Sequence, residues 1–228
     1  MGRAVETTEH AANILIADDH PLFRGALRQT VSNLLPSAVI TEAATLEDTT
    51  SALHDNGDID LLLLDLTMPG TRGYSGLTFL RAQFPSVPII IVSGNEEPSV
   101  MRRCIDFGAS GYIPKTLDTE TMGIAIETVL DGGHWTPPEV DLVTPADRET
   151  SDLLRRLGSL TPQQMRVLMM LSEGLLNKQI AYELSVSEAT VKAHVSAILT
   201  KLGVESRTQA VIAAARIETG QWQAQGGA

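Results

Sequence analysis

Three aspartates in the first half of the chain each follow directly after an apolar run. Asp18 and Asp19 come after residues 13–17, and Asp65 comes after residues 61–64. If both runs are parallel strands of one sheet, their carboxyl ends meet at one edge, where open α/β folds place their ligands. Three carboxylates in one crevice repel each other unless a cation lies between them. Mg²⁺ fits this position, since it prefers oxygen ligands and keeps open positions for water and phosphate oxygens.

Two further polar residues are expected at the same edge. Ser93 ends a fourth apolar run, and Lys115 comes just after a fifth. A carboxylate can attack a phosphoryl group, while Mg²⁺ and a lysine neutralise the phosphoryl oxygens and a hydroxyl donates a hydrogen bond to one of them. One such residue alone is usually a cap, a turn former or a solvated charge. The set of them together indicates phosphoryl chemistry.

The elements that must position these residues alternate along residues 13–132. Short β-branched or leucine-rich runs alternate with longer amphipathic stretches, which predicts a parallel sheet with crossover helices. The run at residues 61–64 is four leucines, as expected of a strand covered on both faces. The predicted strands are residues 13–17, 38–43, 61–64, 88–92 and 111–113, and the predicted helices are residues 22–33, 46–53, 77–83, 100–107 and 119–130.

A linker and a second domain follow. Residues 133–159 contain Gly-Gly, Pro-Pro and scattered acids, with one short helix predicted near residues 151–157. No strand signal recurs afterwards, so residues 160–217 predict a small all-α domain. Thr161, Pro162 and Gln164 form a helix start with a capping box.

Two of the predicted helices are joined by a very short turn. Residues 177–184 and 188–202 are separated only by residues 185–187, which predicts a helix-turn-helix whose second helix enters the DNA major groove. Helical spacing divides that second helix into two faces. The inward face carries Val191, Val195, Ile198 and Leu202, and the outward face carries Lys192, Ala193 and Ser196.

Composition is compatible with this division. The 228 residues carry a net charge of −11. Residues 1–150 hold 9 Lys and Arg against 22 Asp and Glu, which gives −13, whereas residues 151–228 hold 8 against 6, which gives +2. The second part is therefore compatible with a polyanion, and the first would repel one.

The cysteine count and the hydropathy of the chain indicate its cellular compartment. The single cysteine, Cys104, can form neither an internal disulfide nor a cysteine zinc site, and we expect it to be buried in a helix. No apolar run is long enough to span a membrane, and residues 1–13 do not resemble a secretion signal. We therefore expect a cytoplasmic protein without membrane contact.

Residues 13–132 resemble the receiver domain of two-component response regulators. The resemblance is carried in order by Ala17-Asp18-Asp19-His20, Asp65-Leu66-Thr67-Met68-Pro69-Gly70, Ser93-Gly94 and Gly111-Tyr112-Ile113-Pro114-Lys115. It implies a flavodoxin-like doubly wound sheet and a sensor histidine kinase as partner. It also implies the following roles: Asp65 as phosphoacceptor, Asp18, Asp19, Asp65 and the Thr67 carbonyl as Mg²⁺ ligands, Lys115 beside the phosphoryl group, and Ser93 with Tyr112 as a switch pair.

The second domain resembles the LuxR-type output domain over residues 160–215. Leu160-Thr161-Pro162, Glu173-Gly174, Asn177-Lys178-Gln179-Ile180-Ala181, Thr190-Val191-Lys192 and Lys201-Leu202-Gly203-Val204 carry this resemblance. It implies binding to double-stranded DNA, with RNA polymerase as a further candidate partner. The implied contacts are Lys192, Ala193 and Ser196 to base edges, and Lys178, His194 and Lys201 to phosphates. Two of the three base-facing side chains are short, so hydrogen-bonded base readout should be sparse.

Two alternative functions compete with a phosphorylated regulator. Phosphatases of the haloacid-dehalogenase type also use an aspartate nucleophile with Mg²⁺, but they carry a second aspartate two residues later, where this chain has Thr67. The pair with that spacing, Asp58 and Asp60, precedes its strand and should lie at the opposite edge. The other alternative is a receiver that works through protein contacts without phosphorylation. The complete set of acidic pair, acceptor and lysine favours a regulator that is not an enzyme.

Phosphorylation is expected to change the association state. The acidic first domain opposes DNA approach, so a resting monomer with a covered DNA-reading helix is expected. Phosphorylation would draw Ser93 toward the phosphoryl group, Tyr112 would move into the space, and the new surface would pair two receivers into a homodimer. The last helix, near residues 208–217, offers either a second dimer contact or core packing through Val211, Ala214 and Ala215.

Overall fold

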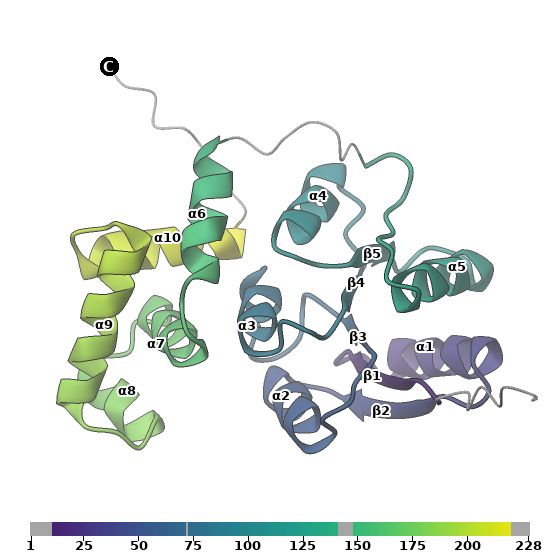
Figure 1. The fold of residues 1–228 in the computed structure, drawn as a ribbon, viewed down its shortest axis with the longest axis horizontal. Coiled ribbons are helices and arrows are strands. Elements are labelled where there is room, and N and C mark those ends of the chain that lie inside the picture. Colours follow the sequence, from purple (N-terminus) through teal and green to yellow (C-terminus); the bar gives the residue numbers. More distant parts are fainter. Residues whose placement is uncertain (1–10, 72, 141–147, 220–228) are drawn as a thin grey trace, which may run out of the picture.

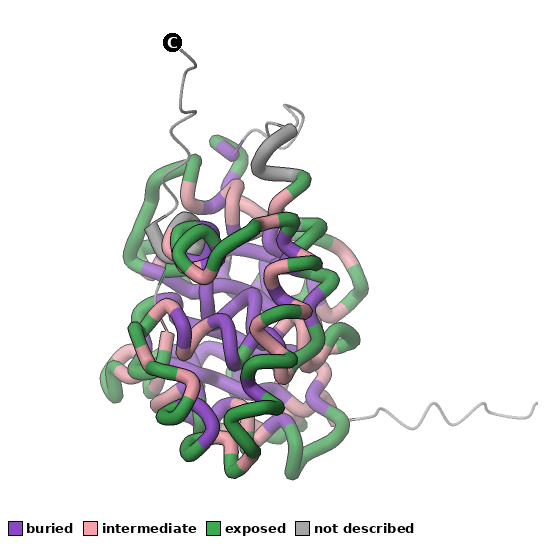
Figure 2. Tube along the Cα trace, turned by 90° about the vertical axis from the view of Figure 1, so that its left-hand side faces the viewer, coloured by how far each residue is buried: buried purple, intermediate pink, exposed green. Residues whose placement is uncertain are grey.

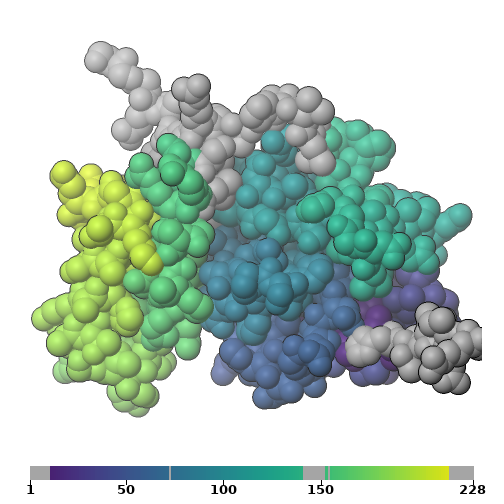
Figure 3. All heavy atoms as spheres, viewed as in Figure 1, coloured from purple at the N-terminus to yellow at the C-terminus, as the bar shows by residue number. Residues whose placement is uncertain are grey.

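The computed structural model describes residues 11–71, 73–140 and 148–219, so part of the predicted linker lies outside the described residues. The chain forms an N-terminal α/β domain and a C-terminal helical domain that lie against each other (Figure 1). The space-filling view shows the two domains in contact along α3 and its neighbours (Figure 3). No described helix is long and apolar enough to cross a membrane.

The N-terminal domain is built on one parallel sheet of five strands in the order β2-β1-β3-β4-β5. The chain runs outward from β1 to β2 and then returns to the other side of β1 for β3, so the strand order reverses between β1 and β3. This confirms the flavodoxin-like doubly wound fold, which binds its ligands at that reversal. The strands are β1 (Asn13–Ala17), β2 (Val39–Ala43), β3 (Leu61–Leu64), β4 (Ile89–Ser93) and β5 (Gly111–Pro114).

Helices cover both faces of the sheet (Figure 1): α1 and α5 on one, and α2, α3 and α4 on the other. Leu61 and Leu63 pack toward α1 and α5, whereas Leu62 and Leu64 pack in the opposite core. The strands are therefore buried in the middle of the domain (Figure 2). The five helices are α1 (Pro21–Leu34), α2 (Leu46–Asp55), α3 (Ser75–Gln83), α4 (Pro98–Asp106) and α5 (Thr119–Leu130).

Cys104 is fully buried in α4, as predicted. Burial raises the pKa of its thiol far above the ordinary value, because the thiolate would lose its hydration. The side chain therefore acts as a small apolar residue of the core.

The C-terminal domain is entirely helical over its described residues. The predicted capping box is present, because Thr161 Oγ1 accepts from the Gln164 amide at 3.3 Å and Gln164 Oε1 accepts from the Thr161 amide at 3.0 Å. Ser187 caps the second helix of the helix-turn-helix, and Gly203 ends it in a left-handed conformation with φ of 66°. The helices are α6 (Arg148–Gly158), α7 (Pro162–Ser172), α8 (Asn177–Glu183), α9 (Glu188–Leu202) and α10 (Arg207–Thr219).

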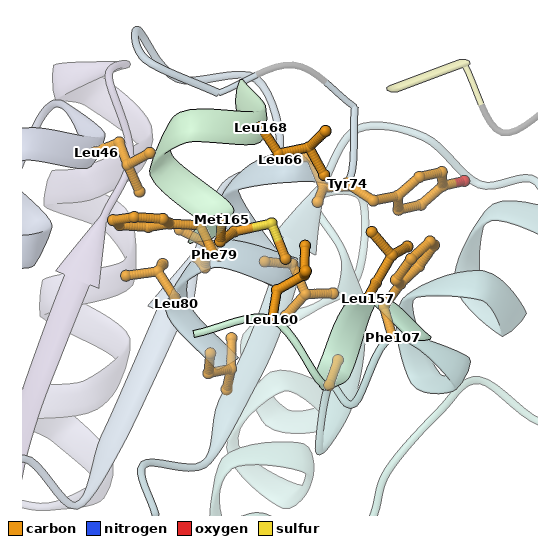
Figure 4. Close-up of a cluster of buried hydrophobic side chains, with 14 of the residues drawn as sticks. Leu46, Leu66, Tyr74, Phe79, Leu80, Phe107, Leu157, Leu160, Met165 and Leu168 are labelled. Atoms are coloured by element: carbon orange, nitrogen blue, oxygen red, sulfur yellow. The ribbon is translucent and has the colours of Figure 1, made fainter. Parts of the chain in front are cut away.

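One apolar cluster joins the two domains. Helix α7 packs against α3, and α6 and α10 also contact α3, while α9 lies on the side away from the N-terminal domain (Figure 1). At the centre, Tyr74 stacks on Phe107 with ring centroids 5.1 Å apart. Figure 4 shows the cluster, formed by Leu46, Leu66, Tyr74, Phe79, Leu80 and Phe107 from the N-terminal domain and by Leu157, Leu160, Met165 and Leu168 from the C-terminal domain.

Candidate functional site

The three aspartates meet at the carboxyl edge of the sheet, as their positions after the strands predict. The Asp65 amide donates to the Ala17 carbonyl at 2.8 Å, and the Asp18 amide donates to the Ala43 carbonyl at 3.1 Å, so the ladder continues one residue past each strand. Asp18 and Asp65 are only 1% exposed. One ligand atom from each of Asp18, Asp19, His20 and Asp65 lies within 4.8 Å of the others.

Lys115 lies between two of these carboxylates. Its Nζ is 2.7 Å from Asp18 Oδ2 and 3.2 Å from Asp65 Oδ2. The Lys115 amide donates to the Ser93 carbonyl at 2.8 Å, which anchors the lysine to the end of β4. The Phe23 ring, 4.5 Å from Nζ, adds a cation–π contact. The Lys115 ammonium therefore lies beside Asp65, where it can pair with phosphoryl oxygens.

One oxygen of Asp65 has no hydrogen-bond partner. Asp65 Oδ2 accepts from Thr67 Oγ1 at 3.0 Å and lies beside Lys115, whereas Asp65 Oδ1 is buried and makes no hydrogen bond to the described residues. Asp18 Oδ2 and Asp19 Oδ1 also lack a hydrogen bond of normal geometry. Lys115 Nζ lies 2.7 Å from Asp18 Oδ2, and His20 Nδ1 lies 2.7 Å from Asp19 Oδ1. Buried acceptors in this condition call for a ligand.

The donor set fits Mg²⁺. Three carboxylates face one lysine, so negative charge remains in the crevice unless a cation enters. His20, to which the sequence analysis gave no role, also reaches the cluster, with Nδ1 2.7 Å from Asp19 Oδ1. The position of His20 directly after the acidic pair in the sequence could have indicated that it lies at the site. His20 can add at most one positive charge, so three carboxylates against Lys115 and His20 still leave negative charge in the crevice.

Ser93 and Tyr112 are adjacent, but Tyr112 already occupies the interior. The Tyr112 ring is fully buried, and its hydroxyl donates to the Asn95 carbonyl at 2.7 Å. Burial raises the pKa of this hydroxyl well above its ordinary value. The ring is therefore already inward in this structure, and the movement of Tyr112 after phosphorylation stays a prediction.

The recognition-type helix α9 has the predicted faces. Val191, Ile198 and Leu202 are buried and Val195 is partly buried, while Lys192, Ala193 and Ser196 are exposed. The expectation that the N-terminal domain covers these residues is therefore wrong for this structure. The N-terminal domain packs against α7, mainly through α3, and leaves this face of α9 exposed. The Lys192 ammonium lies 3.2 Å from Glu188 Oε1, an exposed ion pair that costs little to break.

The other predicted phosphate contacts fall in different settings. Lys178 is exposed on α8, and His194 is half-buried on α9. The Lys201 ammonium donates to the Ser159 carbonyl at 2.6 Å and to Gln164 Oε1 at 2.9 Å. These bonds tie the end of α9 to the start of α7, so the structure engages Lys201 within the domain instead of leaving it free for a phosphate.

The last helix, α10, packs mainly within its own domain. Ala210 and Ala214 are buried and Val211 is partly buried against the core. For Ala214 this favours the core-packing reading over a dimer contact. Ile212 is half exposed on the same helix.

Known proteins resemble both domains and their order. Residues 14–127 match the family model "Response regulator receiver domain", and residues 158–214 match "Bacterial regulatory proteins, luxR family". A glycerol metabolism activator of Pseudomonas putida is 41% identical over 211 residues, which cover 90% of this chain and 96% of that protein. The nitrate/nitrite response regulator protein NarL of Escherichia coli K12 is 32% identical over 210 residues, with the same coverage of 90% and 96%.

A solved structure supports the fold over both domains. The complex of the two-component response regulator RcsB with DNA aligns with a TM-score of 0.54 at 24% identity. The alignment covers 91% of this chain and 100% of that chain.

Proposed function

Because the chain belongs to the two-component response regulators of the NarL/LuxR type, with a receiver domain before a LuxR-type DNA-binding domain, we propose that Asp65 is its phosphoacceptor. The protein is a phosphorylation-controlled, DNA-binding transcription regulator. The observation that carries the proposal is the buried Asp65 Oδ1, which accepts no hydrogen bond from the residues that the structure describes and lies in an acidic crevice that also holds Lys115.

The residues of the crevice divide the work of phosphoryl transfer. An Asp65 oxygen forms a bond to phosphorus while the bond from phosphorus to the histidine nitrogen of a sensor kinase breaks. Lys115 pairs with the phosphoryl oxygens, and the Ser93 hydroxyl donates a hydrogen bond to one of them. Mg²⁺ would offset the remaining charge, held by Asp18, Asp19, Asp65 and the Thr67 carbonyl.

The DNA-binding surface is proposed on α9 and α8. Lys192, Ala193 and Ser196 would face base edges in the major groove, and their exposure supports this assignment. Lys178 and His194 would contact phosphates, whereas Lys201 is better explained by its bonds within the domain. RNA polymerase is a further candidate partner of the DNA-bound regulator.

The two sites are coupled through the apolar cluster between the domains. Leu66 and Tyr74 belong to the segment that leads from Asp65 to α3, and both are buried in this cluster. A rearrangement of this segment would therefore alter the contact with the C-terminal domain as well as the receiver surface. Because α9 is already exposed, the gain from phosphorylation is the pairing of two copies as a homodimer, not the uncovering of one reader.

We expect beryllofluoride with Mg²⁺, which imitates a phosphoryl group on aspartate, to convert the full chain from monomer to dimer. Paired α9 helices should then read a two-fold symmetric site with half-sites about one helical turn apart. Light scattering measures the mass, and anisotropy titration with a duplex selected from a randomised pool measures DNA affinity.

The Asp65→Asn variant is the control for this experiment and should keep its resting mass and affinity in beryllofluoride. An unchanged mass together with an unchanged DNA affinity in the wild-type chain would contradict the dimer mechanism.

A further inference from the structure

An arginine of α1 connects the acidic crevice to the neighbouring strand β2. Arg24 Nη1 donates to the Asp18 carbonyl at 2.6 Å, and Arg24 Nε donates to Glu42 Oε2 at 2.9 Å. Its side chain is 18% exposed, and its amide donates to the His20 carbonyl at 2.9 Å. Arg24 thus holds both the peptide group of Asp18 and the turn that follows it.

The position of this bond matters for the acidic pair. The Asp18 carbonyl belongs to the peptide that joins the pair, one residue beyond the end of β1, and a carbonyl there needs a partner outside the strand. With the Asp18 amide fixed on Ala43 and its carbonyl fixed on Arg24, both sides of Asp18 are held. Restricting this peptide restricts where the Asp19 carboxylate can lie.

Glu42 orients the arginine from β2. Glu42 pairs with Ile16 of β1 in the sheet register, so its backbone position is set by the sheet. Hydrogen bonds from Arg28 and then from Arg24 hold the pKa of Glu42 below its ordinary value. The charged carboxylate accepts from Arg28 Nη1 at 2.7 Å through its other oxygen. A planar guanidinium suits this double role, since its donors are fixed in direction.

We propose that Arg24 is a positioning residue for the magnesium site, acting through the Asp18 carbonyl on the acidic pair. The inference rests on the proposed function, because it concerns the metal that supports phosphorylation. Charge and positioning predict opposite changes in Mg²⁺ affinity when Arg24 is removed. Loss of a positive charge near a cation site should strengthen Mg²⁺ binding by electrostatics alone, whereas loss of a positioning residue should weaken it.

Arg28 provides the matched control. It bonds the same carboxylate of Glu42, but among the described residues it makes no hydrogen bond to Asp18, and its side chain is 59% exposed. Both Arg24→Ala and Arg28→Ala remove one positive charge and one ion pair to Glu42. They differ in the bond to the Asp18 carbonyl.

The test measures Mg²⁺ affinity directly on the full chain, from amide chemical shifts in a magnesium titration of ¹⁵N-labelled protein. Arg24→Ala should raise the Kd for Mg²⁺ about tenfold or more, the range usual for partners that orient metal ligands. Arg28→Ala should leave the Kd unchanged or slightly lower. A thermal melt of each variant measures general destabilisation, which should be larger for Arg24→Ala because that variant also loses the bond to the Asp18 carbonyl.

An Arg24→Ala variant whose Kd equals or falls below that of Arg28→Ala would overturn the inference. If Arg24→Ala does not fold, Arg24→Lys decides, since it keeps the charge but cannot make both bonds in the guanidinium geometry; a normal Kd there overturns the proposal. A wild-type chain that binds no Mg²⁺ would instead contradict the proposed function. The two failures are therefore distinguishable.

Discussion

The Asp65→Asn variant should take up no phosphoryl group from a small phosphodonor such as acetyl phosphate, whereas the wild-type chain should gain one in a Mg²⁺-dependent reaction. The amide cannot supply the carboxylate oxygen that forms the bond to phosphorus. Intact-mass spectrometry before and after incubation measures the gain. The adduct should be lost in hydroxylamine, because an acyl phosphate is reactive where a phosphoserine is not.

Asp58→Asn is the matched control for this experiment. Asp58 is exposed and precedes β3, so it lies at the sheet edge opposite Asp65. This variant should be phosphorylated like the wild-type chain. Labelling of Asp65→Asn at the wild-type level would reject the assignment, and loss of labelling in Asp58→Asn would revive the phosphatase alternative, which requires the Asp58 and Asp60 pair.

The strands were predictable from sequence because this sheet is covered on both faces. Continuous apolar runs such as Leu61–Leu64 have few other placements, and the predicted and observed strands differ by at most one residue at either end. The differences lie at strand ends, where backbone hydrogen bonds determine the first and last residue of a strand. Pro88 cannot donate a hydrogen bond, so β4 begins at Ile89, although the Pro88 carbonyl still accepts from the Leu62 amide at 3.0 Å.

The convergence of the acidic residues was also predictable, since parallel strands bring their carboxyl ends to one edge. Contacts made by long side chains across the fold were not. Lys201 reaches Ser159 across 42 residues of sequence, and Arg24 reaches Glu42 across 18. Such bonds depend on the relative placement of helices and strands, which no local pattern encodes.

The contact between the domains had no sequence signal. A short helix was predicted within the linker, and α6 extends over Arg148–Gly158, but nothing in its pattern indicated that Leu157 is buried against Tyr74 and Phe107. Apolar residues that pack across two domains follow the same helical spacing as residues that pack within one. Because the sequence did not indicate which helices form the contact between the domains, the prediction that the N-terminal domain covers α9 was wrong.

The Lys192→Ala variant should bind DNA more weakly by about 1–3 kcal/mol if Lys192 contacts a guanine edge, and the preference at that base pair should relax. Lys192 is the exposed cation on the outward face of α9, with an ion pair to Glu188 that DNA can replace at little cost. If Lys192 contacts only phosphate, binding should weaken equally on all sequences, and the salt slope should fall by about one. Anisotropy titrations over a salt series distinguish the two cases.

Arg155→Ala is the control for charge alone. Arg155 is a surface cation of α6, 76% exposed and paired with Asp152, and it lies outside the helix-turn-helix. Its loss removes the same charge from the same domain, so it should change affinity only slightly and uniformly, by long-range electrostatics. Lys192→Ala must therefore exceed Arg155→Ala in effect for α9 to be the reading helix. Equal affinities and unchanged sequence preference in the two variants would exclude Lys192 from the DNA interface.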